Sequence, residues 1–277
     1  MRDVSDQILM SLRAGAAPWL TPSSRGIPHN PLTERPFTGI NLLALNAVAD
    51  RQNYRSSYWA TYQDWEQLGL RVRVRPADAS HWKVAARIVG DDWFEALRIF
   101  NAEQIEGPGI EKFCAPVTEA NRTEPVDYQE VEEIIKATGA RVVHHWRCPN
   151  PRCDRPPKDR IVMPPRNWFP NEAHYIASKI HEAIHFAEQP GRAGWTGSLD
   201  QGELIAEVGT AFLETHLGLP HDTELTNVNK WLSQWIEQIE FSPSYLFNAV
   251  EQAEHSVAYL LPQFENRSHD RRTQSVS

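Results

Sequence analysis

The residues best suited to chemistry lie between positions 181 and 207. His181, Glu182 and His185 form the pattern His-Glu-x-x-His. On a helix, positions i and i+4 lie one turn apart on the same face, so two imidazoles at this spacing can bind one metal ion. The glutamate beside the first histidine can take a proton from the water at the metal. The pattern predicts a zinc site of the metalloprotease type, with Glu182 as the catalytic base.

The same residues have a plainer interpretation, as two surface histidines on the polar face of a helix. Ile176, Ile180 and Ile184 recur at helical spacing around the motif. The helix that we expect over about 171–186 therefore has an apolar side that can pack on a core. A motif on such a helix, rather than in a loop, favours the metal site.

A third ligand is expected on the following helix. Glu203 and Glu207 lie 18 and 22 residues after His185, and they are one helical turn apart. In the gluzincin pattern of metallopeptidases, a glutamate on such a helix is a ligand, and an acidic residue one turn later orients a ligating histidine. We assign Glu203 as the third ligand of one Zn²⁺ ion and Glu207 as the orienting residue. The reverse assignment stays open.

The cysteines and the strand before the motif carry less information. Cys148 and Cys153 have a spacing compatible with half of a structural zinc site, but Cys114 is the one other cysteine in the sequence. We interpret the pair as ordinary thiols or a redox-labile pair. Residues 159–164 are expected to form an edge strand that holds an extended substrate by main-chain pairing, although a core strand would have a similar sequence.

A second group of residues suits single-stranded nucleic acid. Positions 54–65 are rich in aromatic residues, and positions 70–75 alternate aliphatic residues with arginines, which a strand would place on one face. Single strands are bound by stacking bases on aromatic side chains in a positively charged groove. The alternative is core tryptophans and a solvated arginine face. We predict a single-stranded-DNA surface made by Trp19, Arg55, Tyr58, Trp59, Arg71, Arg73, Arg75 and Lys83.

The elements that position these residues fall into two groups. The N-terminal part has helical patterns and a run of strand patterns, which together predict a small antiparallel sheet with helices on one side. The C-terminal part is mostly helical. The N-terminal patterns are helices near 4–12, 41–50 and 61–68, and strands near 70–75, 81–89 and 92–100. The helix near 61–68 opens with a Thr61-x-x-Asp64 capping pattern. The C-terminal patterns are strands near 140–146 and 160–163, and helices near 131–135, 171–186, 201–216, 226–239 and 244–260.

Composition and charge are typical of a soluble globular protein. The 277-residue chain is 41% hydrophobic and has a net charge of -8. Residues 1–110 hold equal numbers of basic and acidic residues, so the negative charge belongs to the remainder. No run of apolar residues is long enough to span a bilayer, and the N-terminal residues do not resemble a secretory signal. We expect a cytoplasmic protein with reduced thiols and no membrane partner.

Several short motifs resemble plasmid antirestriction proteins of the ArdC type. The N-terminal motifs are Gly15–Trp19, Asn30–Thr33, Phe37–Asn41, Tyr58–Gln63 and Ile99–Gly107. The C-terminal ones are Ala137–Ala140, Asp159–Pro164, the His-Glu-x-x-His helix and Glu203–Leu213. The resemblance implies an α+β protein, with a small antiparallel-sheet domain that binds single-stranded DNA followed by a mostly helical zincin-like metallopeptidase domain. The implied boundaries are 1–110 for the DNA-binding domain, 111–126 for a linker, 127–265 for the metallopeptidase domain and 266–277 for a disordered tail.

The resemblance also implies a role on a mobile element, in which the protein protects incoming DNA from restriction. It does so either by coating the strand or by acting on an unknown protein or peptide substrate. The segment Ala187–Gln201 and the insertion around Cys148–Cys153 depart from the family pattern. Two other functions stay open. One is a DNA-binding protein with a structural or vestigial zinc site, and the other is an IrrE-like regulatory metallopeptidase that cleaves a repressor.

Overall fold

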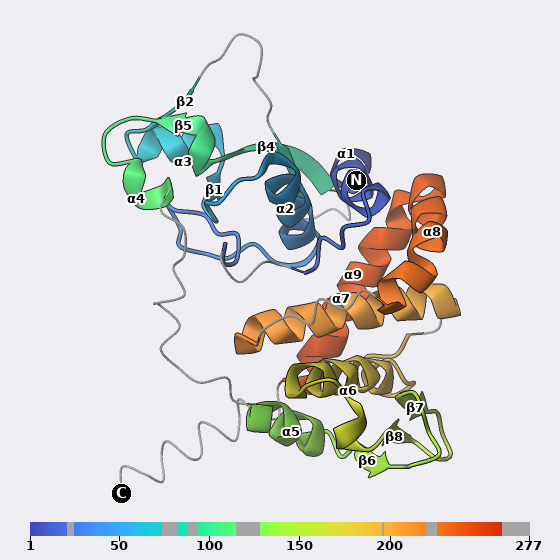
Figure 1. Ribbon diagram of the computed structural model, residues 1–277. Helices are drawn as coiled ribbons and strands as arrows, with labels where there is room; N and C mark the ends of the chain where they lie inside the picture. Colours follow the sequence, from blue (N-terminus) through green and yellow to red (C-terminus); the bar gives the residue numbers. More distant parts are fainter. Residues whose placement is uncertain are drawn as a thin grey trace, which may run out of the picture. The chain divides into compact units, whose positions relative to one another are not determined.

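The computed structural model describes residues 1–20, 25–73, 82–87, 94–114, 128–195, 197–219 and 226–261 (Figure 1). The chain divides into two compact units. The first combines Met1–Glu124 with Leu225–Phe247, and the second combines Pro125–Glu224 with Asn248–Ser277. Helix α9 (Pro243–Leu260) contributes residues to both. Residues 225–247 therefore cluster with the N-terminal unit, whereas the sequence had placed them in the metallopeptidase domain.

Two small antiparallel sheets form the β part of the first unit. β1 (Trp59–Ala60), β4 (Phe94–Asn101) and β3 (Trp82–Arg87) pair in the order β1-β4-β3. β2 (Arg71–Val72) pairs with β5 (Ile105–Glu106). The strands predicted near 81–89 and 92–100 are confirmed as the antiparallel pair β3 and β4.

The helices of this unit pack on its sheets and on one another. They are α1 (Arg2–Arg13), α2 (Gly39–Gln52), α3 (Tyr62–Gln67), α4 (Glu111–Cys114), α8 (Thr226–Phe241) and the 3₁₀ turn η1 (Ala102–Gln104). α3 begins with the predicted capping box, in which Thr61 and Asp64 each accept a hydrogen bond from the other's backbone amide. Leu45 and Val48 of α2 pack against Trp59 and Ile99 of the sheet, and these residues form one hydrophobic core.

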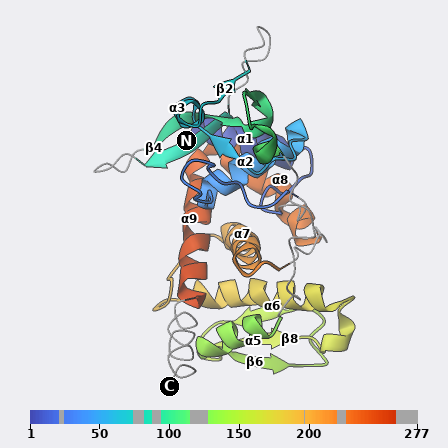
Figure 2. The same ribbon diagram turned by 90° about the vertical axis from the view of Figure 1, so that its left-hand side faces the viewer.

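The second unit places its long helices on one side of a three-stranded sheet. β6 (Arg141–His144), β7 (Arg152–Asp154) and β8 (Arg160–Met163) have the order β6-β8-β7. Its remaining elements are α5 (Tyr128–Ala137), the 3₁₀ turn η3 (Arg166–Trp168), α6 (Glu172–Ala187) and α7 (Leu199–Leu217). Figure 2 shows α6 between α7 and the layer that contains α5 and the sheet, and α6 contacts all of these elements. The expected α+β fold, with a mostly helical C-terminal part, is confirmed.

The strand before the metal helix is not an edge strand. β8 pairs in parallel with β6 on one side and antiparallel with β7 on the other. Its main-chain donors and acceptors are thus used within the sheet, and Ile161, Val162 and Met163 are buried. The prediction that residues 159–164 form a free edge for a peptide is wrong. The strand formed by the Cys148–Cys153 insertion, β7, occupies that side of β8.

Some of the predicted segments extend beyond the residues that the structure describes. The predicted linker 111–126 begins within α4, and its positions from 115 onward lie outside the described residues, as does the predicted tail 266–277. Among the helices that the structure describes, none has the length and apolar character needed to cross a membrane.

Candidate metal centre

Helix α6 carries the His-Glu-x-x-His motif in a fixed orientation. The helix begins at the cap residue Asn171, whose side chain accepts a hydrogen bond from the backbone amide of His174. Its apolar residues Ile180 and Ile184 are fully buried. His181 and His185 consequently lie on one face, with ring centroids 4.9 Å apart.

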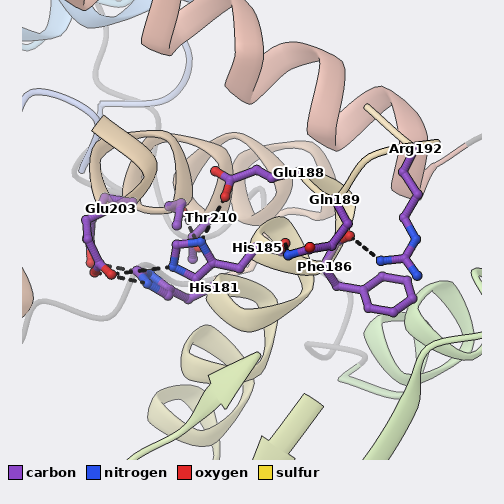
Figure 3. A network of polar contacts seen from close by, with 10 residues as sticks. His181, His185, Phe186, Glu188, Gln189, Arg192, Glu203 and Thr210 are labelled. Carbon is purple, nitrogen blue, oxygen red and sulfur yellow. Dashed lines mark hydrogen bonds and ion pairs between the residues drawn. The ribbon is translucent and has the colours of Figure 1, made fainter. Parts of the chain in front are cut away.

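Helix α7 brings the predicted third ligand to these two histidines. The two carboxylate oxygens of Glu203 lie 3.7 Å from Nε2 of His181 and 3.7 Å from Nε2 of His185. Figure 3 shows the carboxylate beside both rings. One ligand atom from each of the three residues lies within 4.8 Å of the other two. Two imidazole nitrogens and one carboxylate oxygen can hold a divalent metal ion, and catalytic zinc sites use the same donor types with a fourth position open.

The close approach of the two helices depends on a glycine. At Gly209 of α7, an added Cβ would lie 3.0 Å from Cδ1, 3.1 Å from Cγ1 and 3.2 Å from Cγ2 of Ile184. These distances are tighter than ordinary van der Waals contact. The absence of a side chain at Gly209 therefore lets α7 approach α6 at the level of the metal motif.

Each histidine has a carboxylate on its other ring nitrogen. Glu207 Oε1 lies 3.4 Å from Nδ1 of His181, which is the position expected of the orienting residue. Nδ1 of His185 donates to Glu188 Oε2 at 3.0 Å. A carboxylate on Nδ1 fixes the ring and leaves Nε2 directed at the ion. The geometry thus favours Glu203 over Glu207 as the ligand.

Glu188 is a site residue that sequence reasoning missed. It follows the motif by three residues, at the C-cap of α6, and its side chain is 6% exposed. Its other oxygen, Oε1, is buried without a hydrogen-bond partner. An acidic residue three positions after a ligating histidine is a usable signal, because i and i+3 are neighbours on a helix.

The site is built to hold positive charge. Burial lowers the pKa of His181, but Glu203, Glu207 and Glu182 outweigh this effect and raise it to about 9. Burial also raises the pKa of Glu182, and the nearby histidines oppose that rise. The backbone of Cys153 in β7 lies close to the Glu182 carboxylate and also lowers its pKa. The catalytic candidate is therefore held between the metal helix and the neighbouring strand.

The cysteines do not join a metal cluster in the described part of the chain, where His181, His185 and Glu203 form the group with suitable geometry. Cys148 is a buried free thiol that donates to the Asn150 carbonyl at 2.8 Å. Burial raises the pKa of the Cys153 thiol to about 12. Both are ordinary thiols in this structure.

The predicted DNA-binding tryptophans are core residues. Trp59 is fully buried in the core under α2, and Trp19 packs edge-on against Trp235 of α8 with ring centroids 5.9 Å apart. Neither indole can stack on a base in this structure, so these two assignments are corrected. The plainer alternative, core tryptophans, holds because their large apolar rings fill the space between helix and sheet.

The other predicted DNA-binding residues differ in how exposed they are. Arg55, Arg71 and Arg73 are exposed, and Arg71 forms a salt bridge to Glu106 at 2.8 Å. Tyr58 is half-buried against Phe113, with ring centroids 5.0 Å apart. Arg75 lies outside the described residues, and Lys83 is described only as a backbone position of β3. β2 ends at Val72 and Arg75 is not among the described residues, so the face of three strand arginines stays a prediction.

Comparison with known families gives two matches. Residues 1–75 match the model of the N-terminal domain of anti-restriction factor ArdC, and residues 129–252 match a zincin-like metallopeptidase model. Together they cover both halves of the chain, in the order that the motifs imply.

Whole-chain relatives agree with these matches. DNA primase TraC of Escherichia coli is 27% identical over 89% of this chain, and y4eC of Sinorhizobium fredii is 24% identical over 89%. The chain spans 25% of the length of that primase and 86% of the length of y4eC. Crystal structures of the antirestriction protein ArdC from plasmid R388 are 26% identical and cover 95% of this chain and 97% of theirs, with TM-scores of 0.75 for the Mn(II)-bound form and 0.70 for the metal-free form.

Proposed function

We propose that this chain, whose two parts match the ArdC N-terminal domain and a zincin-like metallopeptidase and whose fold is similar to that of ArdC, binds single-stranded DNA and carries a metal-dependent peptidase centre. The proposal of a metal centre rests on one observation: the carboxylate of Glu203 lies close to Nε2 of both motif histidines. A solvated pair of histidines would not require a third donor from a neighbouring helix, nor a carboxylate behind each ring.

In this proposal His181, His185 and Glu203 hold one divalent ion, and Glu207 and Glu188 orient the two imidazoles. The donor set fits zinc, which prefers nitrogen and carboxylate ligands in a tetrahedral arrangement. A related ArdC structure is described as Mn(II)-bound, so manganese is the competing ion. When bound, the ion would polarise the scissile carbonyl and acidify water at the site.

Glu182 is the proposed general base. It follows His181 directly and is buried, and burial raises the pKa of its carboxyl. A raised pKa suits a group that accepts a proton and later releases it. Glu182 would accept one proton from the attacking water as the water oxygen bonds to the carbonyl carbon. It would then donate the proton to the leaving amine as the C–N bond breaks.

The experiment uses metal-loaded protein and a mixture of fluorogenic peptides, with Glu182→Gln as the test variant. We expect the variant to retain stoichiometric metal and to lose about 10²–10⁴-fold in cleavage rate, the usual contribution of a general base. Glu251→Gln, an exposed carboxylate on α9, is the matched control. Undiminished cleavage by Glu182→Gln would contradict the assignment of the base. Wild-type protein that binds metal but cleaves no peptide would favour the structural or vestigial metal site.

For DNA, we propose that the exposed arginines Arg55, Arg71 and Arg73, with Arg75, Lys83 and Tyr58, contact single strands in the first unit. Exposed guanidiniums suit phosphates, because they bind anions bidentately and stay charged at all relevant pH values. Trp19 and Trp59 have no place in this surface. Its role would be to shield entering single-stranded DNA of a mobile element from restriction, as the family resemblance implies.

A further inference from the structure

A cavity of about 400 Å³ lies on the side of α6 that faces α5, and the proposed peptidase centre makes no use of it. It is lined from α5, the end of β6, the turn η3 and the first half of α6. Lys179 and Tyr175 reach it from α6 toward α5, whereas His181 and His185 face α7. Its volume is at the lower end of the roughly 300–1,000 Å³ typical of small-molecule sites.

Two cations lie beside one aromatic ring in this cavity. The Lys179 Nζ lies 5.5 Å, and the Arg166 Cζ 4.7 Å, from the centroid of the Tyr175 ring. The Tyr175 hydroxyl and Nε2 of His144 are hydrogen-bonded to each other at 3.0 Å. Burial, and then the positive charge of Lys179, lower the pKa of His144. The lining thus includes two cations, Lys179 and Arg166, and one carboxylate, Glu132.

The two partners of the Lys179–Glu132 ion pair differ in their exposure to solvent. The Lys179 side chain is 3% exposed, whereas that of Glu132 is 41% exposed. A buried ammonium must keep a negative partner, because an unpaired buried charge is strongly destabilising. Glu132 can instead return to water at small cost. The cation is therefore fixed, and the carboxylate that neutralises it can be exchanged for another.

We propose that this cavity binds a ligand with a single carboxylate, of the size of an acidic amino-acid residue, whose carboxylate replaces Glu132 at Lys179 and approaches Arg166. A single carboxylate restores the negative charge that Glu132 supplies to Lys179, whereas a phosphate dianion would add a second negative charge. Arg166 is already paired with Glu172, and its side chain is 54% exposed, so its guanidinium can turn toward a ligand. This site is separate from the metal centre and does not depend on peptidase activity.

The test measures binding by isothermal titration calorimetry on the full, metal-loaded chain. The probe is N-acetylglutamate α-amide, which has one carboxylate, and its glutamine counterpart is the uncharged match. We expect the carboxylate probe to bind and the amide probe not to. Lys179→Met should weaken binding at least about tenfold, since a hydrogen bond to a charged group contributes roughly that much. Arg166→Gln should weaken it less, because Arg166 is the more exposed cation.

Glu132→Gln should act in the opposite direction and strengthen binding by about tenfold, because it removes the competing carboxylate. Glu133→Gln, the neighbouring exposed residue on α5, makes the same charge change outside the cavity and should have no effect. Lys158→Met, an exposed lysine, is the control for Lys179→Met. Equal binding of both probes, tighter binding of inorganic phosphate, or weaker binding by Glu132→Gln would each overturn the proposal. If Lys179→Met or Glu132→Gln does not fold, the comparison of the two probes on the unaltered chain and the Arg166→Gln result decide it.

Discussion

Replacing Glu188 by glutamine tests how the metal site is oriented. The side chains have nearly the same shape, and the Oε1 position of Glu188 makes no hydrogen bond, so an amide group can occupy it without losing a partner. The change removes the negative charge that faces Nδ1 of His185 at 3.0 Å. Loss of such a contact typically weakens metal binding about 10–100-fold, equivalent to about 1.4–2.7 kcal/mol. We expect a loss in this range for zinc.

Glu207→Gln provides an internal comparison, because its contact with His181 is longer, 3.4 Å, and its side chain is more exposed, 17% against 6% for Glu188. We expect a smaller loss of affinity for Glu207→Gln. The assay is competition for Zn²⁺ with a chromophoric chelator at constant pH, with Glu251→Gln as the control. Unchanged affinity in Glu188→Gln, or a larger loss in Glu207→Gln, would refute the orienting role inferred from these distances.

Three further predictions concern the helix contact, the core and the DNA surface. Gly209→Ala should lower the free energy of unfolding by about 1–3 kcal/mol through overpacking, because three atoms of the fully buried Ile184 lie within 3.2 Å of the new methyl group. Chemical denaturation measures this loss, and recovery of stability on adding Ile184→Val would confirm the cause. Trp59→Ala should lower the free energy of unfolding by about 3–5 kcal/mol, whereas Tyr62→Ala should have little effect because Tyr62 is 50% exposed. A stable Trp59→Ala protein with impaired DNA binding would instead support the role of Trp59 in base stacking. Replacing Arg71, Arg73 and Arg75 together by alanine should weaken binding to a labelled oligonucleotide. It should also reduce the slope of log affinity against log salt concentration by about 2, at roughly 0.7 per phosphate contact. An unchanged slope would exclude these arginines from the DNA-binding surface.

Local sequence signals predicted the helix that carries the metal motif and the start of one helix in the first unit. The pattern around Ile176, Ile180 and Ile184 predicted α6, and the Thr61 and Asp64 pair predicted the start of α3. These signals succeed because helical periodicity and capping involve residues within one or two turns. The placement of Glu203 opposite both histidines also follows from a local rule, namely spacing on a second helix.

What the sequence could not predict depends on contacts between distant segments. Whether Trp59 stacks on a base or fills a core depends on α2, which covers it, and a tryptophan is suited to either place. Similarly, β8 is an inner strand because the insertion after Cys148 folds back as β7. The grouping of residues 225–247 with the first unit depends on packing such as that between Trp235 and Trp19.

X-ray absorption spectroscopy of the zinc-loaded protein tests the metal centre most directly. We predict one zinc ion per chain with nitrogen and oxygen neighbours at about 2.0–2.1 Å, two of them imidazoles, and no sulfur. Glu203→Ala should change the oxygen contribution and leave the imidazole signals. A sulfur shell at about 2.3 Å, which would place the ion at Cys148 and Cys153, or a protein that retains no metal, would contradict the assignment to His181, His185 and Glu203.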